Sequence, residues 1–129
     1  MKIKSFLFKP IIIMKEFVLC FENIDEDIVF YVGENANDNF NVIDKGDPTD
    51  LWFHVKDYSS CHVVARIPEK LDKRELKTII KRGALLCKQN TNKLSNASRV
   101  EIMYTQLQNV SKTNKAGCVN IASSKTICC

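Results

Sequence analysis

The residues with the most obvious chemistry lie in one short segment, DLWFHVKDYSSCH, at positions 50–62. It holds the chain's two histidines, His54 and His62, together with its one tryptophan, Trp52. Imidazole can bind a metal, transfer a proton, or contact a phosphate or a ribose hydroxyl, and an indole face can stack on an unpaired base. The residue types of this segment are therefore compatible with three kinds of site: a metal centre, a catalytic pair and a nucleic-acid surface.

The spacing of the histidines and of Cys61 in the sequence disfavours both a metal centre and a catalytic pair. A metal centre needs three or four converging ligands, and the hairpin stretch between the two histidines fixes no such geometry. Cys61 and His62 are neighbours on a predicted strand, where adjacent side chains point to opposite faces, so this imidazole cannot activate that thiol. The sequence has no CxxC pair and only scattered single glycines, which disfavours zinc-finger and phosphate-loop sites. We expect no metal, no cofactor and no enzymatic activity.

Two hairpins are predicted to position the segment. FVLCF (17–21) and IVFYV (28–32) are rich in β-branched and aromatic residues and predict the first, and LWFHV (51–55) with HVVARI (62–67) predicts the second. GENANDN and KGDPTD, at 33–39 and 45–50, are predicted to break regular structure. Three later strands are expected in the segments RVEIMYT (99–105), CVNIA (118–122) and KTICC (125–129), after a link through QLQNVSKTNKAG.

A long amphipathic helix is predicted after Pro68. Asp72 is a good N-cap, and Glu75 three positions later completes a capping box. Apolar residues recur on one face of this helix at three- and four-residue spacing, namely Leu76, Ile79, Ile80, Gly83, Leu86 and Cys87. A basic stripe follows another face, with Arg74, Lys77, Lys81 and Lys88. The fold class is therefore α+β, with a mainly antiparallel β-sheet and one long amphipathic helix packed across it.

Length and composition predict one globular domain. The 129 residues suffice for a single core, and 45% hydrophobic with 26% charged residues is typical of a folded protein. We expect residues 1–14 to be a poorly ordered extension, residues 15–129 to form the domain, and no segment to span a membrane. Met14 is an alternative start of the chain. The six cysteines are expected to be mostly buried free thiols, as in cytoplasmic proteins.

Charge is distributed unevenly along the chain. Residues 1–57 hold 6 Lys+Arg against 11 Asp+Glu, whereas residues 58–129 hold 13 against 4. The second part is thus strongly basic although the whole chain has a net charge of only +4. A basic face of this kind attracts polyanions, which favours the nucleic-acid reading of the segment at 50–62.

Three motifs, in this order and separation, give the chain a family resemblance. With GENANDN, DLWFHVKDYSSCHVVARI and YTQLQNVSKTNKAGCVNI, it resembles the NFACT-R domain family over about residues 28–127. The D-x-W-F-H segment with the following S-x-H-V-V is specific, and the basic turn that begins at Lys112 supports it independently. The family includes the C-terminal module of ribosome-quality-control factors and short eukaryotic proteins in which the module precedes a coiled coil.

The resemblance implies a non-enzymatic module that binds structured RNA, tRNA or ribosomal RNA, in the cytoplasm. Arg66, Lys112 and Lys115 stand where the family is basic. Glu34 departs from the family, which usually has a basic residue at this position, and this departure argues against a phosphate contact from the GENAN loop. We expect the nucleic-acid contacts to come from the rings, the turn and the basic residues, on one continuous surface: Trp52, His54, Lys56, Ser59, Ser60, His62, Arg66, Lys77, Lys81, Lys112 and Lys115.

Several alternatives stay open at this stage. Phe53 is expected in the core, but Trp52 and His54 point to the other side of their strand and either line a groove or pack beneath other elements. Ser59 and Ser60 either contact phosphate or only form the turn. DNA is an alternative ligand to RNA. The alternative function is a protein–protein adaptor that docks on ribosome-associated or quality-control proteins.

Overall fold

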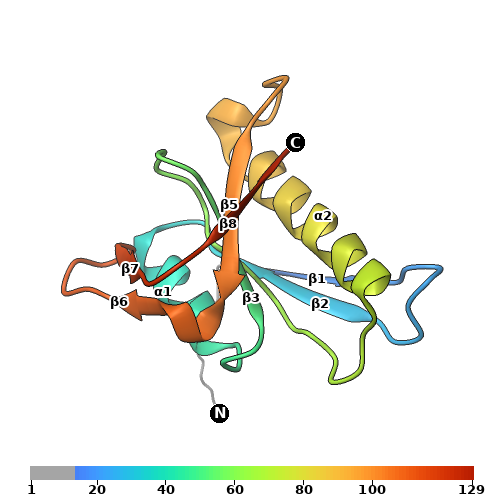
Figure 1. Cartoon of the computed structure of the whole chain (residues 1–129). Helices are drawn as coiled ribbons and strands as arrows, with labels where there is room; N and C mark the ends of the chain where they lie inside the picture. Colours follow the sequence, from blue (N-terminus) through green and yellow to red (C-terminus); the bar gives the residue numbers. More distant parts are fainter. Residues whose placement is uncertain (1–13) are drawn as a thin grey trace, which may run out of the picture.

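Six antiparallel strands form the main sheet of the computed structural model, which describes residues 14–129. Their order across the sheet is β1-β2-β4-β3-β5-β8. Figure 1 shows the chain with most of these strands labelled. Their bounds are β1 Lys15–Leu19, β2 Ile28–Val32, β3 Leu51–Val55, β4 Val63–Ala65, β5 Glu101–Gln106 and β8 Lys125–Cys128. A separate two-stranded ribbon consists of β6 (Val110–Lys112) and β7 (Val119–Ile121). The expected extension at 1–14 lies outside the described residues except for Met14, which is partly buried.

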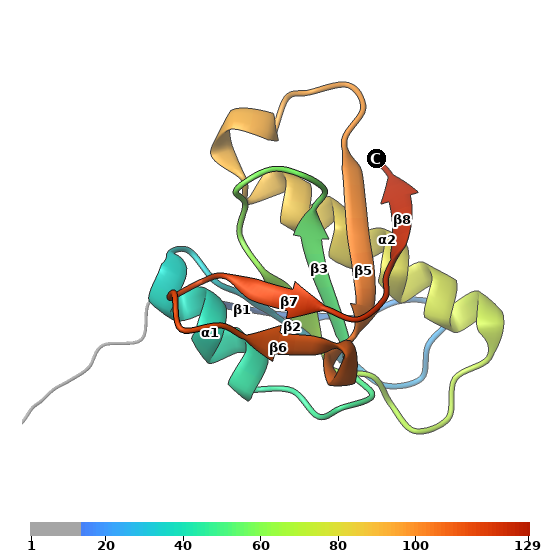
Figure 2. The same ribbon diagram turned by 60° about the vertical axis from the view of Figure 1, so that its left-hand side comes forward.

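The two faces of the main sheet are covered by different elements. Helix α2 (Lys73–Gln89) lies behind the sheet in Figure 2, whereas α1 (Ala36–Asp44) and the β6–β7 ribbon lie in front of it. Side chains of β3 alternate between the faces, so Phe53 joins the core under α2 while Trp52 joins a second cluster with Val42 and Leu107. The expected burial of Phe53 is confirmed. The α+β class, with a mainly antiparallel sheet and one long helix packed across it, is confirmed too.

Helix α2 begins and packs as its sequence predicts. The Asp72 side chain accepts a hydrogen bond from the Glu75 backbone N–H, and the Glu75 carboxylate accepts one from the Asp72 backbone N–H, at 2.8 and 2.9 Å. These reciprocal bonds pair N–H groups that a helix leaves unpaired at its first turn. Ile79 and Cys87 on the predicted apolar face are 0% exposed. Gly83 lets the helix approach closely, because an added Cβ would overlap the Phe53 ring.

Both predicted hairpins are present. β1 and β2 pair antiparallel, with Phe17 opposite Phe30, and β3 and β4 do so with Phe53 opposite Val63. The C-terminal strand β8 returns to the main sheet beside β5, so the strand predicted at 125–129 forms one edge of the sheet. In the described part of the chain, no helix combines the length and hydrophobicity needed to cross a membrane.

Two elements differ from the sequence prediction. The expected break at 33–39 is wrong in its second half, because α1 begins at Ala36 with Asn35 as N-cap. The Asn-rich segment has weak intrinsic helix propensity, and packing of Val42 against the sheet outweighs it. The predicted link through QLQNVSKTNKAG also contains β6, which becomes a strand because β7 pairs with it from Val110 opposite Ile121 to Lys112 opposite Val119.

The cysteine prediction is only partly right. All six cysteines are free, and Cys61 and Cys87 are buried. Cys20, Cys118 and Cys128 are exposed, and Cys129 is half-buried, so burial is wrong for these positions. All four lie at or beyond a strand end or on the β6–β7 turn, outside the central positions of the strands.

Candidate nucleic-acid interface

A cleft of about 1000 Å³ lies on the face of the sheet that carries Trp52. Its walls come from segments far apart in the sequence: β3, the β3–β4 turn, the start of α1, the end of α2 and the turn that follows it, β5, and the β6–β7 ribbon. Clefts of several hundred cubic ångströms with mixed apolar and polar walls are typical of ligand sites. We therefore take this cleft as the candidate site.

The inner wall of the cleft is a cluster of three rings, in which two are stacked and the third meets both edge-on. Trp52 is 0% and His62 1% exposed, and the indole Nε1–H donates a hydrogen bond to His62 Nδ1 at 3.1 Å. The half-buried His54 ring stacks on Trp52 with centroids 5.6 Å apart, and it meets His62 edge-on at 4.9 Å. The sequence left open whether Trp52 lines a groove or packs beneath other elements, and the structure shows it packed. Its indole offers no exposed face for base stacking, and the same holds for His62.

Hydrogen bonds define the tautomers of both histidines. His62 Nδ1 accepts from Trp52, so its proton lies on Nε2, where the Gly117 backbone provides an acceptor. His54 Nδ1 lies 2.6 Å from the Val55 carbonyl, which can only accept, so the His54 proton is on Nδ1 and Nε2 is an acceptor with no hydrogen-bond partner among residues 14–129. This leaves His54 as the imidazole of the pair with a nitrogen available to a ligand.

Burial keeps both imidazoles neutral. Loss of solvation, followed by the charge of His54, lowers the pKa of His62 to about 3, against a weaker opposing effect of the Gly117 backbone. Burial also lowers the pKa of His54, and the hydrogen bond to Val55 opposes that shift. A cationic contact from either ring to a phosphate is therefore disfavoured near neutral pH, whereas a hydrogen bond from a ribose hydroxyl or a base N–H to His54 Nε2 stays available.

The β3–β4 turn forms an exposed rim of the cleft. Ser60 holds its base, because its hydroxyl accepts from the Val55 N–H and donates to the Cys61 carbonyl at 3.0 and 2.9 Å. Ser59 is exposed and lines the cleft, which leaves its hydroxyl available to a ligand. Lys56 precedes the turn and forms a 3.9 Å ion pair with Glu101. The turn-forming reading of Ser60 is thus observed, and phosphate binding by the two serines stays a prediction.

Of the predicted basic residues, Lys115 lines the cleft. Lys112 lies on the same ribbon, but its ammonium forms a 2.6 Å ion pair with Asp44 of α1 and lies 5.2 Å from the centre of the Phe40 ring. Lys112 therefore ties the ribbon to α1, with part of its charge already compensated.

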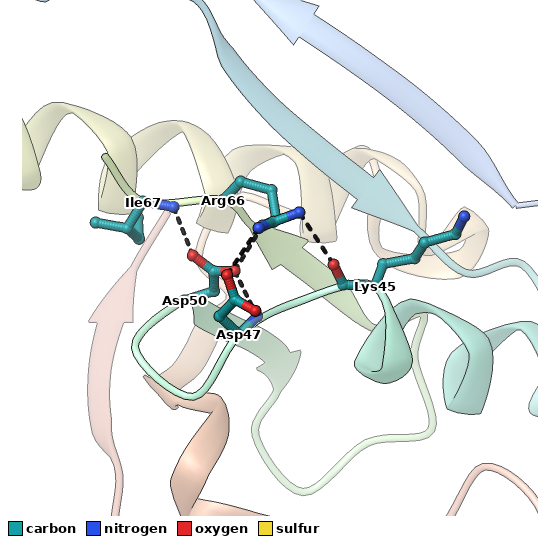
Figure 3. Close-up of polar contacts among 5 residues, drawn as sticks. All are labelled: Lys45, Asp47, Asp50, Arg66 and Ile67. Carbon is teal, nitrogen blue, oxygen red and sulfur yellow. Dashed lines mark hydrogen bonds and ion pairs between the residues drawn. The ribbon is translucent and has the colours of Figure 1, made fainter. Parts of the chain in front are cut away.

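Arg66 belongs to a separate network at the far end of β4 (Figure 3). Its guanidinium donates to the buried carboxylate of Asp50 at 2.6 Å, to Asp47 at 2.9 Å and to the Lys45 carbonyl at 3.2 Å. Partial burial lowers the pKa of Arg66, but the charge of Asp50 and its hydrogen bond raise that pKa on balance. The same Asp50 carboxylate accepts the backbone N–H groups of Asp47 and Ile67 at 2.7 Å each. This network fixes the loop before β3 to the end of β4.

Lys77 and Lys81 are exposed side chains of α2. This helix lies on one face of the sheet, whereas α1 and the β6–β7 ribbon, which line the cleft, lie on the other (Figure 2). The expectation of one continuous surface is therefore wrong. A helix packed on one sheet face cannot bring its outer side chains to the opposite face. The predicted residues form three groups: the cleft with its rim and ribbon, the Arg66 network, and the α2 stripe. Nucleic-acid contact by each residue stays a prediction.

Two of the cleft residues that sequence reasoning missed are an exposed aromatic side chain and a lysine, Tyr58 and Lys93. Tyr58 was treated only as part of a turn, although at 36% exposure it is one of three exposed large hydrophobic side chains within residues 14–129. An aromatic residue at the tip of a turn was the available signal. Lys93 lies in the short 3₁₀ turn Asn92–Leu94 and reaches the cleft only because α2 ends there, so no local signal could have shown it.

Residues 14–129 contain no cluster of three or more histidine, cysteine or acidic side chains that could hold a metal ion. The Cys61 thiol donates to the Cys87 carbonyl at 3.4 Å and lies 3.6 Å from the Thr91 hydroxyl. His62, its sequence neighbour, is committed to Trp52 through Nδ1. These contacts give both groups a packing role and do not assemble a nucleophile with a base.

Comparison with known families agrees with this architecture. Residues 17–123 match the family described as the NFACT protein RNA binding domain. The chain belongs to the NFACT-R family. The match runs from β1 through β7 and thus includes every wall of the cleft, and it supports a nucleic-acid-binding role for the domain.

Individual relatives extend the comparison. The chain is 35% identical over 97 residues to a coiled-coil domain-containing protein 25 homolog of Dictyostelium discoideum, covering 74% of this chain and 47% of that protein. It is also 35% identical over 85 residues to coiled-coil domain-containing protein 25 of Mus musculus, covering 64% and 40%. The chain thus spans less than half the length of these relatives.

A solved structure shows the same fold. The C-terminal part of the fibronectin/fibrinogen-binding protein of Streptococcus suis superposes with a TM-score of 0.72 at 23% identity, covering 96% of this chain and 47% of that one. At this level of identity the likeness concerns the fold alone.

Proposed function

We propose that this NFACT-R domain binds structured RNA, tRNA or ribosomal RNA, as a non-enzymatic module of the cytoplasmic translation or ribosome-quality-control machinery. The observation that carries the proposal is the family match over residues 17–123, which includes the elements around the cleft. In this proposal the cleft is the RNA site, and its rim and ribbon supply the contacts.

The charges of the cleft support an anionic ligand. Its charged lining residues are Glu34, Lys93 and Lys115. Glu34 forms a 3.1 Å ion pair with Lys15, whereas neither lysine takes part in an ion pair within residues 14–129. Two lysines that form no ion pair with the described residues are therefore available to phosphates, and each phosphate contact releases condensed counterions.

The direct test is binding of fluorescently labelled tRNA by the 129-residue chain, measured by anisotropy across a range of salt concentrations. The wild type should bind with an affinity that falls steeply as salt rises. The double variant Lys93→Ala/Lys115→Ala should bind more weakly and lower the slope of log K against log salt by about 0.7–0.9 per lost phosphate contact. Absence of binding, or binding that ignores salt, would refute an electrostatic RNA site.

A matched control comes from α2. The double variant Lys77→Ala/Lys81→Ala removes the same net charge from the opposite sheet face, so it separates a specific contact from a general loss of positive charge. If this variant lowered the slope of log K against log salt, the basic stripe of α2 would be part of the RNA-binding surface. If only the α2 variant lost affinity, the cleft would not be the RNA site. Duplex DNA as competitor tests the alternative polyanion.

A further inference from the structure

The cleft combines an apolar wall with side-chain amides, two features that suit a nucleotide base. Half-buried Met103, Val119 and Ile121 provide an apolar part. Asn92 provides an exposed side-chain amide, and Asn35 lines the cleft with an amide whose oxygen already caps α1 by accepting from Asp38. Bases pair an apolar ring face with a hydrogen-bonding edge, so amides beside an apolar wall suit them. The volume of about 1000 Å³ leaves room for such a group.

Tyr58 is the ring of the cleft that is free to stack. Among the residues that the structure describes, the exposed large hydrophobic side chains are Val18, Tyr58 and Leu85, and only Tyr58 is aromatic and lines the cleft. Trp52 and His62 are fully packed, so neither can offer a face to a ligand. Base–aromatic stacking needs an open ring face, and Tyr58 supplies one.

The turn that carries Tyr58 is anchored on both sides. Asp57 adopts a left-handed backbone conformation, with φ of 55°, immediately before it. The Lys56 N–H donates to the Glu101 carbonyl at 3.0 Å, and Ser60 binds Val55 N–H and the Cys61 carbonyl. An anchored turn holds an aromatic ring in place before a ligand arrives, which lowers the entropy lost on binding.

We infer that the cleft holds one unpaired nucleotide of an RNA, with its base stacked on Tyr58 and its phosphates near Lys93 and Lys115. This inference rests on the proposed RNA-binding function and specifies the ligand of the same site. Bases within a duplex are stacked on both faces by their neighbours, so only an unpaired base has a face for Tyr58. His54 Nε2 is the acceptor available to a hydroxyl or N–H of this nucleotide.

The test compares two double-stranded RNAs of equal nucleotide count, each formed from two strands without a loop: a blunt-ended duplex and a duplex with a short unpaired 3′ extension. The wild-type chain should prefer the extended RNA. Tyr58→Ala should lose roughly 5- to 150-fold in affinity for the extended RNA, as expected from a lost stacking contact, and should bind the blunt RNA as the wild type does. Tyr58→Phe keeps the ring and should keep the preference.

Two controls make the result specific. Leu85→Ala shortens a side chain with the same 36% exposure on α2, and it should leave both affinities unchanged. A 2-aminopurine in the unpaired extension should be quenched by the wild type and by Tyr58→Phe but not by Tyr58→Ala, because stacking quenches this base. Circular dichroism of each variant checks that the fold is retained.

The outcomes separate this inference from the proposed function. Equal affinity of the wild type for both RNAs, or an unchanged preference in Tyr58→Ala, would overturn the unpaired-nucleotide site while leaving RNA binding intact. Absence of binding to either RNA would overturn the proposed function and this inference with it.

Discussion

Replacement of His62 by asparagine should remove a large part of the pH dependence of folding stability. The wild-type imidazole has a pKa of about 3 in the folded domain, against about 6.5 when solvated in the unfolded chain. Between these values the unfolded state binds the extra proton, so the free energy of unfolding falls as pH decreases through this window. Above about pH 6.5 both states are neutral and this contribution is constant.

The magnitude follows from the size of the shift. Each pH unit inside the window costs about 1.4 kcal/mol, so a decrease from about pH 7 to about pH 5 should lower the free energy of unfolding by about 2 kcal/mol through His62 alone. His62 is 1% exposed, so solvent screens little of this effect. Asn is a suitable replacement because its Oδ1 can accept the Trp52 N–H that Nδ1 accepts now.

Urea unfolding of both proteins at the two pH values, followed by far-ultraviolet circular dichroism, measures the difference. His62→Asn should be less stable than the wild type near neutral pH, because the smaller side chain leaves a cavity, but it should lose about 2 kcal/mol less on acidification. His54→Asn is the comparison, since that ring is only half-buried and its pKa shift is in the same direction. Equal acid sensitivity of wild type and His62→Asn, or a nuclear magnetic resonance titration of His62 near pH 6.5, would refute the reasoning.

Two further substitutions test the packing of the fold by urea unfolding. Gly83→Ala places a methyl group against the Phe53 ring and should lower the free energy of unfolding by about 1–3 kcal/mol, whereas Leu85→Ala on the exposed side of α2 should change it by less than about 0.5 kcal/mol. Asp50→Asn removes a buried charge that accepts three hydrogen bonds and should cost about 2–4 kcal/mol. Asp47→Asn, with its side chain 71% exposed, should cost less than about 1 kcal/mol. The burial described above would be contradicted if the buried and the exposed substitution of either pair lowered the free energy of unfolding equally.

Local sequence patterns were sufficient for most of the fold. Both hairpins, the capping box of α2 and its apolar face depend on residues a few positions apart, and hydrophobic periodicity reports such relationships directly. The motifs around Trp52 and Lys112 also identified the family from the sequence. Helix α1 could not be predicted in this way, because its Asn-rich sequence is a weak helix former and contacts with the sheet stabilise it.

The candidate site depended on the tertiary structure. Strand alternation placed Trp52 and His54 on the face opposite Phe53, but it could not show that α1 and the β6–β7 ribbon bury the indole there. The sequence shows only that Arg66 is basic. The tertiary structure shows that its charge is compensated by ion pairs with Asp47 and Asp50. The sequence alone therefore determined the family, the hairpins and the long helix, since these are encoded in neighbouring residues. The tertiary structure decided which rings and charges reach the cleft, because that depends on contacts between segments that the chain brings together only on folding.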